Sequence, residues 1–163
     1  MKYPQYIQHK IFSSKEIAFQ VNRWKMISKK ISFTNGCFDI LHPGHIASLS
    51  DAAREADILI VGVNADVSAR RLKGVGRPVM DENTRALMLA SLAMVDAVVI
   101  FEEDTPLDLI GLVKPDVLVK GGDYTIEQIV GAKEVIDAGG RVVINPILRG
   151  FSTTGIIGKI RSL

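Results

Sequence analysis

The chain has 163 residues, 47% of them hydrophobic and 23% charged, and its formal net charge is only +2. This length and apolar content predict one globular domain and exclude a disordered chain, while the small net charge argues against a protein that works on nucleic acid. A single cysteine excludes an internal disulfide, and no apolar run reaches the length of a membrane span. We therefore expect a cytoplasmic protein without a signal peptide or a membrane anchor.

The first 30 residues are expected to form an N-terminal arm and a helix, ahead of the main domain over residues 31–163. Residues 1–12 read as an irregular arm. Ser13 and Glu16 have the spacing of a capping box, and apolar residues then recur at helical spacing, which predicts a helix of about 14 residues. Its Trp24 is interpreted as a core or dimer contact rather than a platform for stacking a base.

The most informative stretch covers residues 32–45. A short apolar run ends in small polar residues, and His42 and His45 then flank a Pro-Gly pair directly before a helical pattern. This order is typical of a strand, a tight turn and the first turn of a helix, and Gly44 lets another group approach the backbone closely. Free backbone N–H groups and the positive end of the helix dipole would lie beside two imidazoles, which favours a phosphate site.

The next units continue an alternation of strand and helix. A nearly unbroken apolar run over residues 57–63 predicts a parallel strand buried on both faces, reached by a right-handed crossover. A short helix, 67–72, leads into a basic, glycine-punctuated loop. Its Lys73 and Arg77 are either ordinary solvated charges or part of a loop that closes over substrate phosphate.

Two further helices have recognisable starts. Asp81 is expected to cap a helix that carries Arg85 among apolar residues, where an isolated arginine usually pairs at the surface. Residues 95–101 read as the third strand, and Asp104 or Thr105 is expected to cap the helix that follows.

A double glycine follows the fourth predicted strand, 116–119. Two glycines at the carboxyl end of a strand allow backbone to lie against a flat ring, so Gly121 and Asp123 are candidates for a nucleoside pocket, with a plain turn as the alternative. Helical residues then lead to the fifth strand, 141–145.

Three hydroxyls, from Ser152, Thr153 and Thr154, open the terminal helix beside Arg149. Ser152 alone would be an ordinary N-cap, but three in a row indicate a second helix terminus that holds phosphate. Strands and helices alternate from about residue 31 to the end, so the predicted fold is one α/β, Rossmann-like domain whose five-stranded parallel sheet is flanked by helices.

The stretch Phe38-Asp39-Ile40-Leu41-His42-Pro43-Gly44-His45 resembles the signature of the nucleotidyltransferase superfamily that carries two histidines around a glycine, and Ser152-Thr153-Thr154 is similar to its second motif. The resemblance implies a Rossmann-type domain that joins a nucleoside monophosphate to a phosphorylated small molecule and releases pyrophosphate. It implies a catalytic set of His42, His45, Lys73 and Arg85, with Arg85 approaching the nucleotide phosphates. The implied nucleotide-binding residues are Asn35, Gly36, Cys37, Phe38, Asp39, Gly44, Gly121, Asp123, Arg149, Ser152, Thr153 and Thr154.

The attacking phosphate is already an anion, so this chemistry needs alignment and charge stabilisation rather than a general base. Mg²⁺ is expected, held mostly by the triphosphate itself, and no metal ligands are assigned in the chain. Asp39 either touches that ion or braces the turn. Cys37 is interpreted as structural rather than as a nucleophile, because no Cys-His-carboxylate arrangement is visible.

Within the superfamily, residues 34–39, 63–66, 71–74, 77–79, 101–106 and 118–124 look most like heptose 1-phosphate adenylyltransferases. That likeness implies ATP and D-glycero-β-D-manno-heptose 1-phosphate as small-molecule substrates, ADP-heptose for lipopolysaccharide biosynthesis as the product, and a homodimer. Many such relatives are fused to a sugar kinase. The alternative is a cytidylyltransferase acting on glycerol 3-phosphate or a related alcohol phosphate. A second alternative, of another class, is a non-catalytic nucleotide-binding regulatory domain.

Overall fold

In the computed structural model, which describes residues 5–148 and 150–163, six parallel strands form one sheet in the order β1-β4-β3-β2-β5-β6. The chain leaves the centre of the sheet in one direction, from β2 to β4, and then returns to the other side of β2. The switch point therefore lies between β2 and β5, where open α/β sheets place their ligands. The strands are β1 (Ile11–Phe12), β2 (Ile31–Gly36), β3 (Ile58–Asn64), β4 (Ala97–Phe101), β5 (Val117–Gly121) and β6 (Arg141–Asn145).

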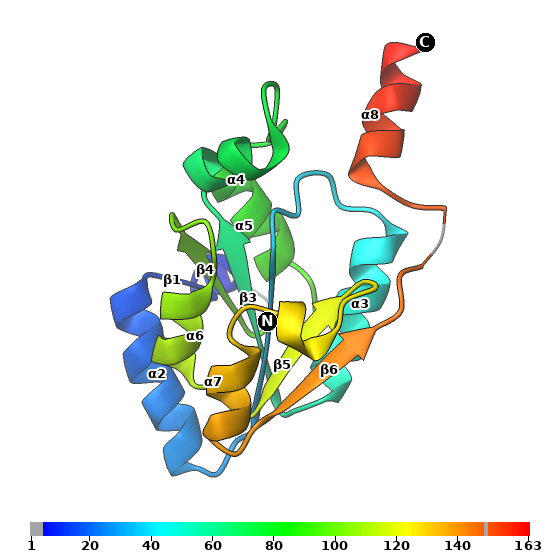
Figure 1. Ribbon diagram of the computed structural model, residues 1–163. Coiled ribbons are helices and arrows are strands. Elements are labelled where there is room, and N and C mark those ends of the chain that lie inside the picture. Colours follow the sequence, from blue (N-terminus) through cyan, green and yellow to red (C-terminus); the bar gives the residue numbers. More distant parts are fainter. Residues whose placement is uncertain (1–4, 149) are drawn as a thin grey trace.

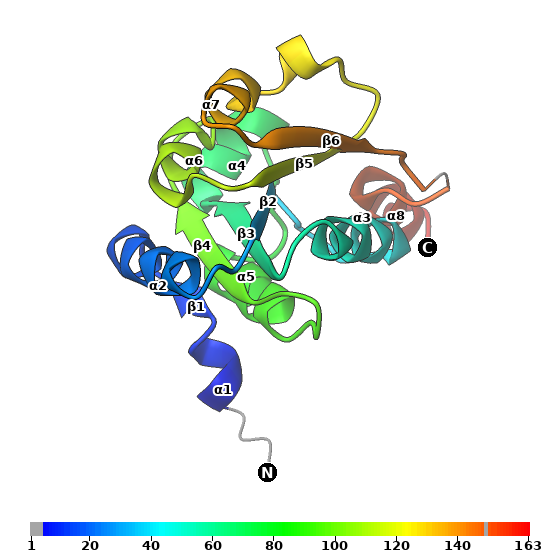
Figure 2. The ribbon, with the colours of Figure 1, turned by 90° about the horizontal axis from the view of Figure 1, so that it is seen from below.

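Helices cover both faces of this sheet. Figure 2 shows α2, α6 and α7 on one side, and α3 and α5 on the other. The helices are α1 (Gln5–Gln8), α2 (Ser14–Met26), α3 (Pro43–Arg54), α4 (Asp66–Lys73), α5 (Glu82–Ala90), α6 (Leu107–Val113), the 3₁₀ turn η1 (Ile126–Gln128), α7 (Ala132–Asp137) and α8 (Thr153–Arg161). The α/β, Rossmann-like prediction is confirmed.

The prediction of five strands is wrong by one, because part of the expected irregular arm joins the sheet. Strand β1 has two residues and pairs in parallel with β4, with Ile11 opposite Val98. Lys10 anchors this pairing, since its Nζ donates to the carbonyls of Val95 at 2.7 Å and Leu92 at 3.3 Å. A strand of two residues is too short to show an alternating pattern in the sequence. It is recognised only in the folded protein, where it pairs with the edge of β4.

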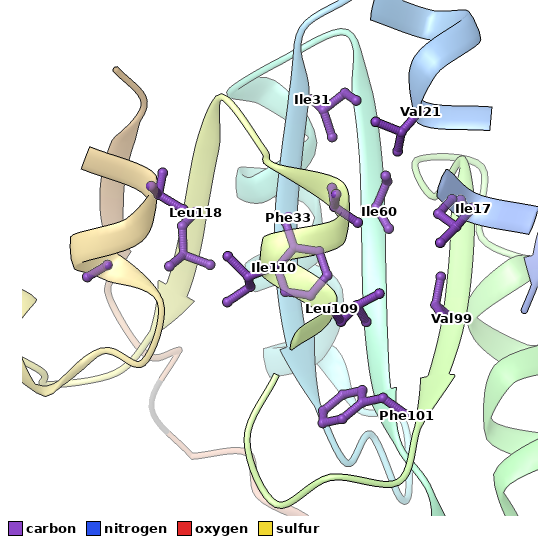
Figure 3. Close-up of a cluster of buried hydrophobic side chains, with 14 of the residues drawn as sticks. Ile17, Val21, Ile31, Phe33, Ile60, Val99, Phe101, Leu109, Ile110 and Leu118 are labelled. Carbon is purple, nitrogen blue, oxygen red and sulfur yellow. The ribbon is translucent and has the colours of Figure 1, made fainter. Parts of the chain in front are cut away.

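The hydrophobic core has two layers, one on each face of the sheet. On one face, Phe33, Ile60 and Leu118 pack with the buried side chains of α2 and α6 (Figure 3). The other cluster joins the alternate residues of β3 to α3 and α5. The prediction that residues 57–63 are buried on both faces is confirmed over β3. The domain boundary at residue 30 stays a prediction, while Ile17 and Val21 of α2 lie in the first cluster.

Helix caps set the ends of the elements that approach the site. The predicted capping box of Ser13 and Glu16 is confirmed, as is the cap by Asp81, whose carboxylate accepts from the backbone N–H groups of residues 83 and 84. The predicted cap of α6 is wrong: Pro106 holds the N-cap position without a side-chain hydrogen bond. Asp104 accepts instead from Arg71 Nε at 2.6 Å, so its carboxylate is turned toward α4.

In Figure 1, α4 and α8 stand at the end of the molecule toward which β3 runs, and α3 begins near that same end. No helix among residues 5–148 and 150–163 is both long and apolar enough to cross a bilayer.

Candidate active site

The loop after β2 brings two histidines face to face at the start of α3. His42 is the N-cap in extended backbone, and Pro43 begins the helix as predicted. The Nδ1 atom of His42 accepts from the backbone N–H of His45 at 3.4 Å, so the ring proton sits on Nε2 and remains available to a ligand. The two rings stack with centroids 3.8 Å apart and planes 17° apart.

The second histidine is kept neutral by its surroundings. Burial, and next the neighbouring His42, lower the pKa of His45 to about 4. Burial also lowers the pKa of His42. His45 Nδ1 is buried and has no hydrogen-bond partner among the described residues. At neutral pH this pair therefore offers ring N–H donors rather than positive charge.

Asp39 lies just before the two histidines in sequence and holds the loop around Arg77 in place. Its side chain is 1% exposed, and its carboxylate accepts from Arg77 Nε at 2.6 Å and from the backbone N–H groups of Val79 at 2.7 Å and Met80 at 3.0 Å. These bonds occupy both oxygens, which favours the bracing role over metal contact. The described residues contain no group of three or more His, Cys, Asp or Glu suited to a metal.

Phe38 and Cys37 shape the floor of the site. Phe38 adopts a positive φ of 48° and presents its ring edge to His45, with centroids 5.3 Å apart. Burial raises the pKa of the Cys37 thiol, so the sulfur stays protonated at neutral pH. A protonated thiol is a poor nucleophile, which supports the structural interpretation of Cys37.

Arg85 is buried beneath the loop that carries the two histidines and does not face solvent. Its side chain is fully buried, and it donates to the carbonyls of Cys37 at 2.5 Å and Met80 at 3.0 Å and to Asp66 Oδ1 at 2.8 Å. The structure therefore does not bring its guanidinium to the cavity described next. The phosphate contact implied by the resemblance stays a prediction. The observed contacts make Arg85 a brace that joins α5 to the loop after β2, to the segment before α5 and to α4.

The start of α8 meets the start of α3 across one cavity. Ser152 caps α8, accepting from the backbone N–H of Gly155 at 3.0 Å, and Thr153 Oγ1 donates to the Ile40 carbonyl at 3.4 Å. The space between the two helices, which we call the histidine cavity, measures about 420 Å³. Its lining includes Cys37, Phe38, Asp39, His42, His45, Lys73, Arg77, Ser152, Thr153 and Thr154. The two motifs, far apart in sequence, thus converge.

Two further cavities adjoin the histidine cavity. The strand-end cavity, about 350 Å³, lies beside the ends of β2 and β5 and is lined by residues including Asn35, Gly36, Cys37, Lys73 and Lys120. It shares Cys37 and Lys73 with the histidine cavity. The glycine cavity, about 210 Å³, is lined by residues including Gly44, Ser48 and Gly121 and shares both histidines.

Some residues singled out in the sequence lie elsewhere, and one was missed. Asp123 is exposed and lines none of these three cavities, and Arg149 lies outside the described residues. Lys120 lines the strand-end cavity but was not identified as a site residue. The available signal was a lysine at the end of an otherwise apolar strand, directly before a double glycine.

Gly44 is expected to be required for the position of the His42 ring. A Cβ at this position would lie 3.0 Å from ring atoms of His42 and 3.6 Å from Phe151 Cβ, so the ring must give way by a few tenths of an ångström. Gly44→Ala should lower turnover about tenfold, less than the roughly 10²-fold cost of a 1 Å misplacement. Steady-state kinetics would measure this loss.

Gly158→Ala is the matched control for that substitution. A Cβ at Gly158 in α8 would have no neighbour within 4 Å outside its own helix backbone in the described part of the chain, so turnover should be unchanged. Equal losses in the two variants would contradict a local effect on His42.

A family model described as cytidylyltransferase-like matches residues 33–159. The chain is 55% identical over 152 residues to the bifunctional protein HldE of Mesorhizobium japonicum and 54% identical over 153 residues to the protein of the same name from Acidiphilium cryptum. These alignments cover 93% and 94% of the chain. The chain spans only 31% and 32% of the relatives' own length.

Solved structures give a consistent result. The lipopolysaccharide core biosynthesis protein from Thermoplasma volcanium is 30% identical with a TM-score of 0.60, and the match covers 74% of this chain and 97% of that one. Pantoate-beta-alanine ligase from Francisella tularensis has a TM-score of 0.59 over 94% of this chain and 78% of its own. At 16% identity the latter shows a shared fold alone.

Proposed function

The chain belongs to the cytidylyltransferase-like family of nucleotidyltransferases, and on that basis we propose that it joins AMP from ATP to D-glycero-β-D-manno-heptose 1-phosphate, forming ADP-heptose and pyrophosphate. The observation that carries the proposal is one cavity lined by both histidines and by Ser152, Thr153 and Thr154. The substrate choice is supported by more than 50% identity to bifunctional HldE proteins, of which the chain would represent the transferase part.

In the proposed reaction, a phosphate oxygen of the acceptor attacks the α-phosphorus of ATP while the bond to the β-phosphate breaks. The neutral imidazoles of His42 and His45 donate hydrogen bonds to α- and β-phosphate oxygens, together with the backbone N–H of Gly44 in the first turn of α3. Pro43 has no N–H, and the N–H of His45 is bonded to His42. The Ser152 and Thr154 hydroxyls at the start of α8 hold the departing pyrophosphate, while the Thr153 hydroxyl is donated to the Ile40 carbonyl and fixes the helix start against the histidine loop. Lys73 lies where two cavities meet and supplies charge to both reacting groups.

The three cavities suggest how the substrates divide. The nucleoside would occupy the glycine cavity, where Gly121 leaves backbone open to a flat ring, and the acceptor would occupy the strand-end cavity. ATP would enter as its Mg²⁺ complex, so that the metal arrives with the substrate. We also propose that the protein works in the cytoplasm as a homodimer, and that a sugar kinase activity supplies its acceptor.

A cytidylyltransferase acting on glycerol 3-phosphate is the second candidate, favoured by the description of the matching family model. Pyrophosphate release separates the candidates when ATP and CTP are each offered with heptose 1-phosphate and glycerol 3-phosphate. We expect release only with ATP and heptose 1-phosphate. Release only with CTP would establish the second candidate, and no release with any pair, despite measurable ATP binding, would indicate a regulatory domain.

A further inference from the structure

Lys120 occupies a position in the sheet where a charged side chain is unusual. It is the penultimate residue of β5, next to the switch point, and its strand neighbours from Val117 to Val119 are buried. Side chains alternate between the faces of a strand. Lys120 therefore points to the same face as Leu118, which belongs to the cluster packed under α2, α6 and α7.

Among the residues that the structure describes, the ammonium group of Lys120 has fewer hydrogen-bond acceptors than it has donors. It donates to Asn35 Oδ1 at 3.2 Å, whereas a lysine ammonium has three N–H donors. No carboxylate among residues 5–148 and 150–163 lies within 4 Å of it, although Lys29, Lys30 and Lys133 all have such a partner. Burial lowers the pKa of Lys120, which is the signature of a cation that has lost water without gaining an anion.

The strand-end cavity is the space that this ammonium faces. Lys120 and Lys73 both line it. One carboxylate, that of Asp104, also lines it but is paired with Arg71 at 2.6 Å. The cavity is therefore positively charged on the side of the sheet opposite α3 and its two histidines.

In the proposed reaction two negatively charged substrates must come together, and the charge of Lys120 would offset part of their repulsion. A phosphorylated acceptor must bring its anionic group against a triphosphate, and the two repel at short distance. The histidines are neutral and lie on the nucleotide side, so they do not offset the charge of the acceptor. A cation on the other face of the sheet can offset the negative charge of the acceptor.

We propose that Lys120 is an acceptor-binding residue, whose ammonium pairs with the phosphate group of the sugar phosphate in the strand-end cavity while Lys73 bridges that cavity to the nucleotide. This inference rests on the proposed function for the identity of the two substrates. It assigns selectivity for a phosphorylated acceptor to β5, a strand outside both sequence motifs.

The test measures binding rather than turnover. Protein loaded with the non-hydrolysable α,β-methylene analogue of ATP is titrated calorimetrically with heptose 1-phosphate and, separately, with inorganic phosphate. Lys120→Met and Lys120→Gln should each weaken both ligands about 10- to 100-fold, the range for a charge-assisted hydrogen bond. Lys120→Arg should keep most of the affinity. The dissociation constant of the ATP analogue should stay within about twofold in all variants, because no nucleotide contact is removed.

Lys133→Met is the matched control, since Lys133 is exposed and pairs with Asp137 at the surface. It should bind every ligand as the wild type does. The proposal is overturned if Lys120→Met binds heptose 1-phosphate normally, if it loses the sugar phosphate but keeps inorganic phosphate, or if it loses the nucleotide equally. A wild-type protein that binds neither phosphate ligand also overturns it. If the wild-type protein binds the sugar phosphate but releases no pyrophosphate, the proposed function is refuted. The effect of the Lys120 substitutions on phosphate affinity can still be measured in that case.

Discussion

Replacing His45 with alanine is expected to lower turnover about 10²- to 10³-fold, the usual cost of removing one donor to a charge-developing oxygen. The fold should persist, because the ring borders a cavity and belongs to neither hydrophobic cluster of the described residues. The rate of pyrophosphate release measures the loss, and circular dichroism measures the fold. Near-normal turnover would refute the role assigned to this histidine.

His9→Ala is the control for that variant, because His9 is exposed and lines none of the three cavities. It should retain full activity.

The same pair of variants also tests the protonation state of His45. The NMR signal that disappears in His45→Ala should titrate in the wild type near the pKa of about 4, well below 6.5. The ring then becomes charged only as the pH falls through that range. Titration at 6.5 would contradict a neutral, desolvated donor.

Replacing Arg85 with methionine is expected to destabilise the protein by about 3–5 kcal/mol. The change removes a fully buried guanidinium from the one-third exposed carboxylate of Asp66 and from two carbonyls, and a buried acceptor left without its donor costs about 1–3 kcal/mol. The change leaves Asp66 without its partner and the carbonyls of Cys37 and Met80 without their donor. For a chain of this size, the melting temperature should fall by about 6–20 °C. Thermal and urea unfolding would measure the change in stability.

Arg71→Met is the matched control for Arg85→Met. Its pair with Asp104 is about half exposed on both sides, so the loss should not exceed about 1 kcal/mol. The two interpretations of Arg85 give different results. A brace predicts lower stability with ATP affinity retained below the melting temperature. Direct phosphate contact predicts weak ATP binding with unchanged unfolding, and that outcome would contradict the bracing interpretation.

The elements that sequence reasoning placed correctly are those with a local physical signal. The capping box at Ser13, the proline that opens α3, the apolar run of β3 and the hydroxyl cap at Ser152 each lie within a few residues of the structure they specify. The elements placed wrongly depend on distant partners. Strand β1 exists through the edge of β4, and Asp104 turns away from α6 because Arg71 of another helix holds it.

The site divides in the same way. The order of residues alone was enough to identify two helix starts suited to phosphate, because a helix terminus and its cap are properties of consecutive residues. Which charges face the cavities was decided only in the folded protein. Arg85 and Lys120 are both isolated cations on apolar elements. Arg85 is enclosed by three protein oxygens, whereas Lys120 faces a cavity and, within the described ranges 5–148 and 150–163, donates to one acceptor at 3.2 Å. That difference comes from strand order and packing, which bring together residues dozens of positions apart.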